Sequence, residues 1–311
     1  MERCEDNLRF RQITDALAAV QIVRGKVLRM IHKFFLEKDF TLVDPPIMHE
    51  RITNKKHEIY LPLYDGRYSL NSSNALYMAA CAALFGKVYA ISPTFRDEQD
   101  SVNHLVEFRM LEVEMPGVCY RELPDFVEAI LIFLLNELST LPEIRRLPLL
   151  WRRMETLLES FPFQRVPYED FVRELGRAGG RKIRSGLDLS EIDYMVSAYI
   201  DSPVFVMDYP RSLASWTAKR QGDAGACALN LILPETYGEL CEGCERTSDV
   251  ALLRRKIEGV GIDNLQWYLA AVERIHAPRC GFGIGVDRLV RWITGSAHIR
   301  DTVLFPRMKL R

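Results

Sequence analysis

The sequence from residue 95 to residue 114 reads FRDEQDSVNHLVEFRMLEVE, and this stretch gives the strongest indication of the fold. Apolar residues on either side of its polar part predict strands at 88–95 and 108–115, joined by the charged residues 96–107. Two strands around such a connection can present Arg96, Glu98, His104 and Phe108 toward one cleft, a combination that suits a planar base carrying a polyphosphate. From composition alone, a solvated turn is the more common explanation for charges at a hairpin tip.

A second informative stretch is GFGIGVDRL at 281–289, which predicts a glycine-spaced strand at 280–286 leading into a helix at 287–293. Glycines two residues apart let another group approach the backbone closely, and Arg288 in the first helical turn can project over it. The spacing does not match the dinucleotide-binding fingerprint. Taken alone, the pattern is also that of a tightly packed strand.

The rest of the chain alternates between helical and strand periodicity. Helices are predicted at 8–37, 74–84, 124–137, 250–258 and 265–274, and further strands at 40–43, 204–207, 227–233 and 237–241. Because strands outnumber clean β-α-β units, we predict an α+β fold with an antiparallel sheet flanked by helices. The chain 1–311 is expected to be one catalytic domain with a less regular helical insertion at about 143–202.

The composition is that of an ordinary globular protein, with 48% hydrophobic and 27% charged residues. A net charge of -1 gives no sign of a broad basic face for nucleic acid. The N-terminus lacks the apolar core of a signal peptide, and the apolar run 129–135 is too short to span a bilayer. We therefore predict a cytoplasmic protein.

The seven cysteines are an odd number spread along a chain without a secretion signal, so free thiols are predicted. Cys241 and Cys244 form a C-x-x-C, which could be half of a zinc site or a redox pair. No second C-x-x-C and no histidine pair stands at zinc-finger spacing. Metal or redox chemistry at these cysteines is therefore the less favoured interpretation.

Together, 95–114 and 281–307 resemble motifs 2 and 3 of class II aminoacyl-tRNA synthetases, and FTLVDPPIM at 40–48 resembles motif 1. The most similar branch is that of the asparaginyl- and aspartyl-tRNA synthetases, and the resemblance is weakest at about 143–200. It implies the antiparallel sheet of that class and a homodimer with Pro46 at its interface. It also implies an ATP-dependent ligase that forms an aminoacyl-adenylate and releases diphosphate, and later AMP.

The resemblance further assigns an ATP site. Arg96 would clamp the α-phosphate and the substrate carboxylate, since two anions can meet only between fixed cations. Arg288 would cover one face of adenine and reach the γ-phosphate, while Phe108 stacks on the other face. Glu98 would lie near adenine or the final acceptor, and His104 would face the γ-phosphate.

A metal site follows from the same resemblance. Glu239, with Arg96 and Arg288 the third expected catalytic residue, would hold Mg²⁺ between the phosphates. Asn230 stands where the family has a further acidic ligand. Losing a carboxylate weakens a Mg²⁺ site, so metal binding at Glu239 is the least supported of these assignments.

The amino-acid pocket is assigned in the same way. Arg246 matches the arginine that reads the substrate side chain in this branch, and its guanidinium suits a carboxylate or carboxamide oxygen. Glu112 would accept from an ammonium or amide nitrogen. The other amino-acid contacts would be Ser73, Ala75 and Met78.

Several positions depart from the family, and most are substrate contacts. Asn103 replaces the arginine of an Arg-His pair, and the pocket reads Ser73-Asn74-Ala75 with Met78 nearby. The lid segment 53–58 reads TNKKHE instead of being rich in Glu and Gly, and Cys241 and Glu242 occupy glycine positions. The first helix begins almost at residue 1, which leaves no room for an anticodon-binding domain and argues against charging of tRNA.

We therefore expect an enzyme that uses ATP and Mg²⁺ to adenylate aspartate, asparagine or a relative, and then transfers the acyl group to ammonia or another amine. An asparagine synthetase or an amide ligase of specialised metabolism would fit this description. Transfer to a tRNA or a protein is the first alternative. A regulatory paralogue without catalytic activity is the second.

Overall fold

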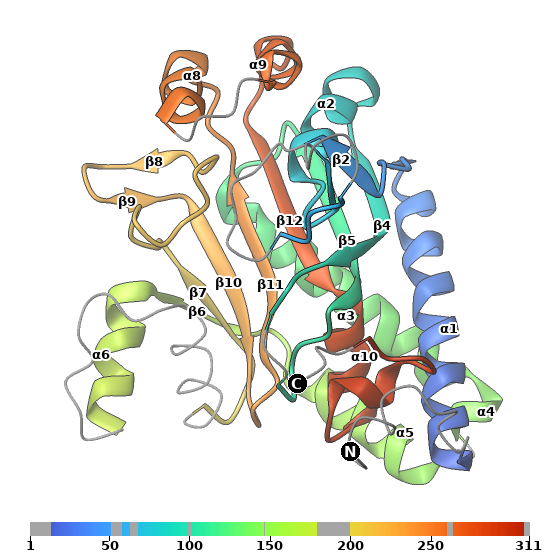
Figure 1. Ribbon diagram of the computed structural model, residues 1–311. Helices are drawn as coiled ribbons and strands as arrows, with labels where there is room; N and C mark the ends of the chain where they lie inside the picture. The colour runs from blue at the N-terminus through green and yellow to red at the C-terminus, as the bar shows by residue number, and fades with distance from the viewer. Residues whose placement is uncertain are drawn as a thin grey trace, which may run out of the picture.

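The computed structural model describes residues 14–50, 58–62, 68–98, 101–145, 147–178, 200–259 and 264–307. Its centre is an eight-stranded sheet (Figure 1). The strands, in spatial order, are β1 (Thr41–Leu42), β4 (Val88–Phe95), β5 (Glu107–Pro116), β12 (Arg279–Gly285), β11 (Gly238–Glu245), β10 (Ala228–Leu233), β7 (Val204–Met207) and β6 (Gln164–Pro167). The inner pairings are antiparallel, whereas the edge pairs β1 with β4 and β6 with β7 are parallel. The predicted α+β fold with a largely antiparallel sheet is confirmed.

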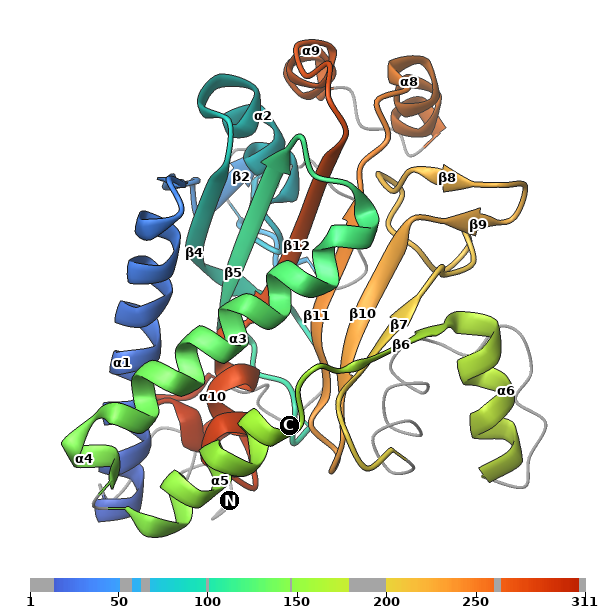
Figure 2. The same ribbon diagram turned by 180° about the vertical axis from the view of Figure 1, so that it is seen from behind.

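One face of the sheet is covered by helices. Helix α3 (Leu123–Thr140) runs obliquely across it, as Figure 2 shows, with α1 (Asp15–Glu37), α5 (Pro148–Glu159) and α10 (Val286–Thr294) beside it. Helix α1 starts at an N-cap, where the Thr14 hydroxyl accepts from the Leu17 N–H at 3.2 Å. Its buried residues Val23, Val27 and Ile31 recur at helical spacing and join the largest apolar cluster. This cluster fixes the back of the sheet, so the opposite face is free to build a site.

Further elements lie around the sheet's ends and edges. Helices α2 (Ala75–Phe85), α8 (Val250–Gly259) and α9 (Gln266–Glu273) lie together at one end of the sheet (Figure 1). The short elements are β2 (Met48–Glu50), β3 (Tyr68–Leu70), η2 (Tyr120–Glu122), α4 (Pro142–Arg145), α6 (Tyr168–Ala178), β8 (Arg220–Gln221), β9 (Gly225–Ala226) and η3 (Ile299–Thr302). In the described part of the chain, no helix has the length and apolar character needed to cross a membrane.

The predicted elements agree closely with the structure where the pattern is strong. Strands β4 and β7 have the predicted bounds, and α1 ends where predicted, although residues 1–13 lie outside the described part. Strand β11 runs to Glu245, four residues beyond the predicted end at 241. The segment 143–202 contains β6, which was not predicted and which completes one edge of the sheet; residues 179–199 lie outside the described part.

Candidate active site

A cavity of about 920 Å³ lies over the middle of the sheet. Its lining comes from the connection between β4 and β5, from β5, β11 and β12, and from the first turns of α2 and α10. All residues assigned to ATP or amino-acid contacts from the sequence line it. They are Ser73, Ala75, Met78, Arg96, Glu98, His104, Phe108, Glu112, Glu239, Arg246 and Arg288. Asn230 is not part of the lining, but its side-chain amide donates to the Glu239 carboxylate.

The cross-strand register explains how these side chains reach one face. One row across the sheet is Asn230, Glu242, Gly283 and Glu112, and the next is Ala228, Cys244, Gly281 and Glu114. Residues two apart on a strand point to the same face, and neighbouring strands lie about 4.8 Å apart. Gly281 and Gly283 contribute no side chain to these rows, so side chains of neighbouring segments reach over β12: Glu114 and Arg246 over Gly281, and Met110 over Gly283.

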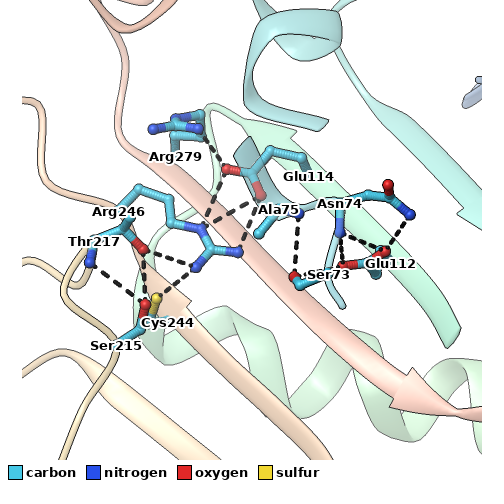
Figure 3. Close-up of polar contacts among 10 residues, drawn as sticks. All are labelled: Ser73, Asn74, Ala75, Glu112, Glu114, Ser215, Thr217, Cys244, Arg246 and Arg279. Atoms are coloured by element: carbon cyan, nitrogen blue, oxygen red, sulfur yellow. Dashed lines mark hydrogen bonds and ion pairs between the residues drawn. The ribbon is translucent and has the colours of Figure 1, made fainter. Parts of the chain in front are cut away.

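Arg246 lies in a fixed network at one end of the cavity (Figure 3). Its Nη2 donates to the Glu114 carboxylate at 3.2 Å, and its Nη1 donates to Thr217 Oγ1 at 3.2 Å and to Cys244 Sγ at 3.0 Å. Arg279 donates to the same carboxylate at 2.6 Å. Burial raises the pKa of the Cys244 thiol, so its sulfur is an uncharged acceptor. One carboxylate therefore serves two guanidinium groups, and the network keeps a net positive charge.

The remaining hydrogen-bonding capacity of Arg246 is small. A guanidinium carries five N–H groups. The Nε group also donates to Glu114, at 3.3 Å from Oε1, and both Nη1 protons and one Nη2 proton are used within the network. These contacts leave the second Nη2 proton for a ligand. Arg246 can thus offer one N–H to a substrate oxygen without rearrangement.

Gly281 makes this network possible. A Cβ at this position would overlap both Glu114 Oε2 and Arg246 Nη2, because the ion pair passes directly over the strand backbone. The glycine is therefore needed for the close approach of the two side chains. Its φ angle is not in the left-handed region, so conformational freedom plays no part.

Glu112 holds the start of α2. Its buried carboxylate accepts from Ser73 Oγ at 3.0 Å, from the Asn74 backbone N–H at 2.8 Å and from Asn74 Nδ2 at 3.0 Å. Asn74 is the N-cap residue of α2, so Glu112 fixes the segment expected to contact the amino acid. Met78, on the first turn of the helix, is buried and completes this wall.

Arg288 lies on α10 next to Glu239, toward the other end of β11. Its Nη1 donates to the Glu239 carbonyl oxygen and its Nη2 to the Asn103 carbonyl oxygen at 3.2 Å. Its Nη2 also lies 3.5 Å from His104 Nε2, while Ser101 Oγ holds the other ring nitrogen at 2.6 Å. Within the described chain no carboxylate forms an ion pair with Arg288, so its positive charge is available to an anion.

Asn103 is held by Arg291, a residue whose role was not predicted from the sequence. Arg291 donates to Asn103 Oδ1, and Asn103 Nδ2 donates to the Thr236 carbonyl oxygen at 2.9 Å. Arg291 is buried, and this burial lowers its pKa. The contacts tie the turn that carries His104 to α10. A buried second arginine thus supports the position where the family has an arginine in motif 2.

Arg96 and its neighbours form one group at the ends of β4 and β5. The Arg96 guanidinium lies 5.4 Å from the centroid of the Phe108 ring and its Nε donates to the Ser72 carbonyl oxygen at 3.2 Å. Glu98 lies between Arg96, at 3.7 Å, and His104, at 3.6 Å. The charged connection therefore lines the cavity and does not form only a solvated turn.

Glu239 offers one carboxylate to a metal ion, and one of its oxygens already accepts from Asn230. In the described ranges there is no group of three or more His, Cys, Asp or Glu side chains that could hold a metal ion. Mg²⁺ usually combines one or two carboxylates with substrate phosphates and water. The donor set therefore does not fit a resident metal, but it does fit a single contact to an ion that arrives with ATP.

The two cysteines of the C-x-x-C lie on opposite faces of β11. Cys241 packs in the core beneath the sheet, whereas Cys244 lines the cavity beside Arg246. Burial raises the pKa of both thiols. Residues three apart on a strand point in opposite directions, so this pair forms neither a disulfide nor a shared metal site.

Four residues of the site were not predicted from the sequence: Glu114, Thr217, Arg279 and Arg291. The one usable signal was the spacing of Glu112 and Glu114, because charged residues two apart on a strand that is otherwise apolar must share a face. Thr217 and Arg279 carried no signal in the sequence, since their partners lie far away along the chain. Their contribution follows only from the sheet order.

Known proteins share this architecture. The family model described as tRNA synthetases class II (D, K and N) matches residues 6–309. The asparaginyl-tRNA synthetase from Pyrococcus horikoshii, complexed with asparaginyl-adenylate, has a TM-score of 0.83 at 26% identity, over 96% of this chain and 70% of that one. The asparaginyl-tRNA synthetase from Entamoeba histolytica, in complex with asparaginyl-adenylate, has a TM-score of 0.82 at 22% identity, over 96% of this chain and 69% of that one. A putative aspartyl-tRNA synthetase from Leishmania major Friedlin has a TM-score of 0.76 at 21% identity, over 95% of this chain and 66% of that one.

Proposed function

The chain belongs to the class II tRNA synthetase family that comprises the D, K and N enzymes, and we propose that it forms an aminoacyl-adenylate from ATP and transfers the acyl group to ammonia or another amine. The amino acid would be aspartate, asparagine or a close relative. The observation that carries the proposal is the division of one cavity into two cationic ends. Arg96 and Arg288 have charge available for phosphates, and Arg246 presents an N–H for an amino-acid side chain.

The adenylation step requires that a carboxylate attack the α-phosphate of ATP, so two anions must approach each other. Fixed cations in a cavity with little water stabilise the charge that develops. Arg96 would supply this cation, because its only ion pair in the described chain is the loose one to Glu98 at 3.7 Å. The new bond joins the carboxylate oxygen to phosphorus, and diphosphate leaves.

The other end of the nucleotide would be held by Arg288, His104 and Phe108. Arg288 is oriented by neutral carbonyl oxygens, which fix the guanidinium without cancelling its charge. His104 is fixed by Ser101. The Phe108 ring would stack on adenine, and the Arg96 guanidinium now near that ring would then turn toward the α-phosphate.

Class II synthetases use ATP together with Mg²⁺. In this chain the ion would enter as part of the MgATP substrate, with Glu239 as a single carboxylate contact. Asn230 would remain the partner of Glu239 and fix its orientation. Arg96 and Arg288 would stabilise the charge that develops on the phosphates.

The acceptor is best identified from the products. Wild-type protein incubated with ATP and aspartate or asparagine should give an amide product by mass spectrometry when ammonium or a primary amine is present. Bulk tRNA should stay unlabelled. Labelling of tRNA or of a protein lysine, without any amide, would support the first alternative function and contradict transfer to a small amine.

We also propose that the chain forms a homodimer through the edge of the sheet at β1. The segment after α1 and the segment before β4 meet at this edge, where Lys87 Nζ donates to the carbonyl oxygen of Lys38 at 2.7 Å. Exposed apolar side chains gather on these and neighbouring segments. They are Leu36, Leu42, Ile47, Met48, Leu84 and Phe85. Pro46 is exposed in the same region. An edge strand beside such a patch favours association with a second copy.

Leu42→Asp should convert the dimer to a monomer, because Leu42 is 54% exposed on the edge strand and a buried carboxylate would lack a partner. Light scattering coupled to size-exclusion chromatography measures this directly. Leu149→Asp is the matched control, since Leu149 is 84% exposed on α5, away from this edge. A wild-type monomer at micromolar concentration, or equal effects of both variants, would contradict the proposed interface.

A further inference from the structure

Glu242 lies in the floor of the cavity, between the two cationic ends. It pairs with Asn230 on β10 and with Gly283 on β12, its side chain is exposed, and it lines the cavity. Glu239 and Glu242 pair with Ile232 and Asn230, which are two residues apart on β10, so at about 3.3 Å per residue the two acids lie about 7 Å apart along the sheet. Arg246 follows the end of β11, about 13 Å from Glu242 on the same rise. It therefore stands where the centre of an aminoacyl-adenylate would lie.

Glu242 differs from the other acids of the cavity because it has no hydrogen bond or ion pair within the described part of the chain. Five carboxylates that line the cavity have hydrogen bonds or ion pairs: Glu98, Glu112, Glu114, Glu239 and Asp287. For Glu242 the described residues provide neither a hydrogen bond nor an ion pair. Gly283 opposite it has no side chain, and the apolar end of Met110 lies over this glycine, so the neighbour of the carboxylate on β12 offers it no polar group. An unpaired carboxylate in an open cavity is suited to a cationic ligand.

We propose that Glu242 binds the acceptor as an ammonium ion and takes one of its protons during acyl transfer; this rests on the proposed function. Phosphates and the substrate carboxylate are repelled by Glu242 and attracted to the arginines at either end. An ammonium ion is instead attracted to Glu242 and repelled by the arginines. Among the described residues that line the cavity, Glu242 is the carboxylate without a hydrogen bond or ion pair. The acceptor of this site is thus a primary amine or ammonia, and not a hydroxyl group.

The Glu242 carboxylate accepts one proton from the ammonium ion, which leaves a neutral amine with a lone pair. This nitrogen forms a bond to the acyl carbon, and the bond from that carbon to the phosphate oxygen breaks. AMP departs with the electron pair of the broken bond, and the second proton lost by the nitrogen passes to water.

Glu242→Gln tests this role, because it removes the charge and keeps the size. With ammonium or methylammonium as acceptor at pH 7, amide formation should fall by about 100-fold, the usual range for loss of a general base. Amino-acid-dependent exchange between ATP and diphosphate should stay within about twofold, as this readout does not involve the acceptor. Glu242→Asp should recover part of the transfer rate.

Two controls separate a base from a structural role. Hydroxylamine is mostly uncharged at pH 7 and needs no base, so hydroxamate formation by Glu242→Gln should match wild type. With methylammonium, the deficit should shrink as the pH approaches about 10, where alkyl amines lose their proton unaided. Glu273→Gln, on the exposed face of α9 outside the cavity, should change none of these rates.

The inference is overturned if Glu242→Gln transfers to ammonium as fast as wild type, or if hydroxylamine and ammonium transfer fall equally. It is also overturned if exchange is lost together with transfer, because Glu242 would then act in adenylation or folding. A wild-type protein that shows no exchange with any amino acid would instead contradict the proposed function itself, and with it this step.

Discussion

Arg96→Ala should lower amino-acid-dependent exchange between ATP and diphosphate by about 10³-fold, at the upper end of the losses seen when one preorganised charge donor is removed. Arg96 is the cation at the meeting point of β4 and β5, with a loose ion pair to Glu98 at 3.7 Å and a hydrogen bond to the Ser72 carbonyl oxygen. Its side chain is 31% exposed, so stability should change by less than about 1 kcal/mol.

Arg109→Ala is the matched control for this variant. Arg109 follows Phe108 on β5 and is exposed outside the cavity lining. Its substitution by alanine removes the same charge as Arg96→Ala. Its exchange rate should equal that of wild type. Arg96→Lys should recover only part of the activity, because an ammonium cannot span two oxygens as a guanidinium does. Similar losses in Arg96→Ala and Arg109→Ala would show that Arg96 has no specific role.

Glu114→Gln should destabilise the protein by about 3–5 kcal/mol, the cost of leaving a buried charge without its partner. Glu114 is fully buried and is the carboxylate shared by Arg279, which is 3% exposed at the side chain, and Arg246. An amide cannot balance either guanidinium. The midpoint of urea unfolding should fall accordingly, and the Michaelis constant for the amino acid should rise because Arg246 loses its orientation.

Glu107→Gln controls for this change, because Glu107 lies on the same strand but is exposed, and stability should shift by less than about 0.5 kcal/mol. A double-mutant cycle with Arg279→Gln adds a sharper test. Removing Arg279 should cost less in the Glu114→Gln background, where its charge is already uncompensated, than in wild type. Strictly additive losses would contradict the shared ion pair.

The sequence predicted the fold well where periodicity is strong. Strand β4 and strand β7 are short apolar runs between polar segments, and both were predicted with their observed bounds. Strand β11 was cut short because Glu242, Gly243 and Cys244 interrupt the apolar pattern; the site itself requires this interruption, since Glu242 and Cys244 face the cavity. Strand β6 was missed because its residues are mostly exposed at the edge of the sheet.

The site was predictable only as far as its motifs carry information. Arg96, Phe108 and Arg288 were singled out in local stretches and Glu239 through the resemblance, and the structure brings all four to one cavity. The network of Glu114, Arg246 and Arg279 could not be predicted from such stretches. Glu114 lies 132 positions from Arg246 and 165 positions from Arg279 in the sequence. Only the order of β5, β12 and β11 in the sheet brings them together. Likewise, nothing in the sequence shows that Glu242 has no hydrogen bond or ion pair among the residues that the structure describes.

The central claim, formation of an aminoacyl-adenylate, is tested most directly by exchange of labelled diphosphate into ATP with each amino acid in turn. We predict exchange that depends on aspartate, asparagine or a close relative, and that falls by about 10³-fold in Arg96→Ala but is retained in Arg109→Ala. Absence of exchange with every amino acid, in protein that binds ATP and is folded, would contradict the account and favour a regulatory paralogue.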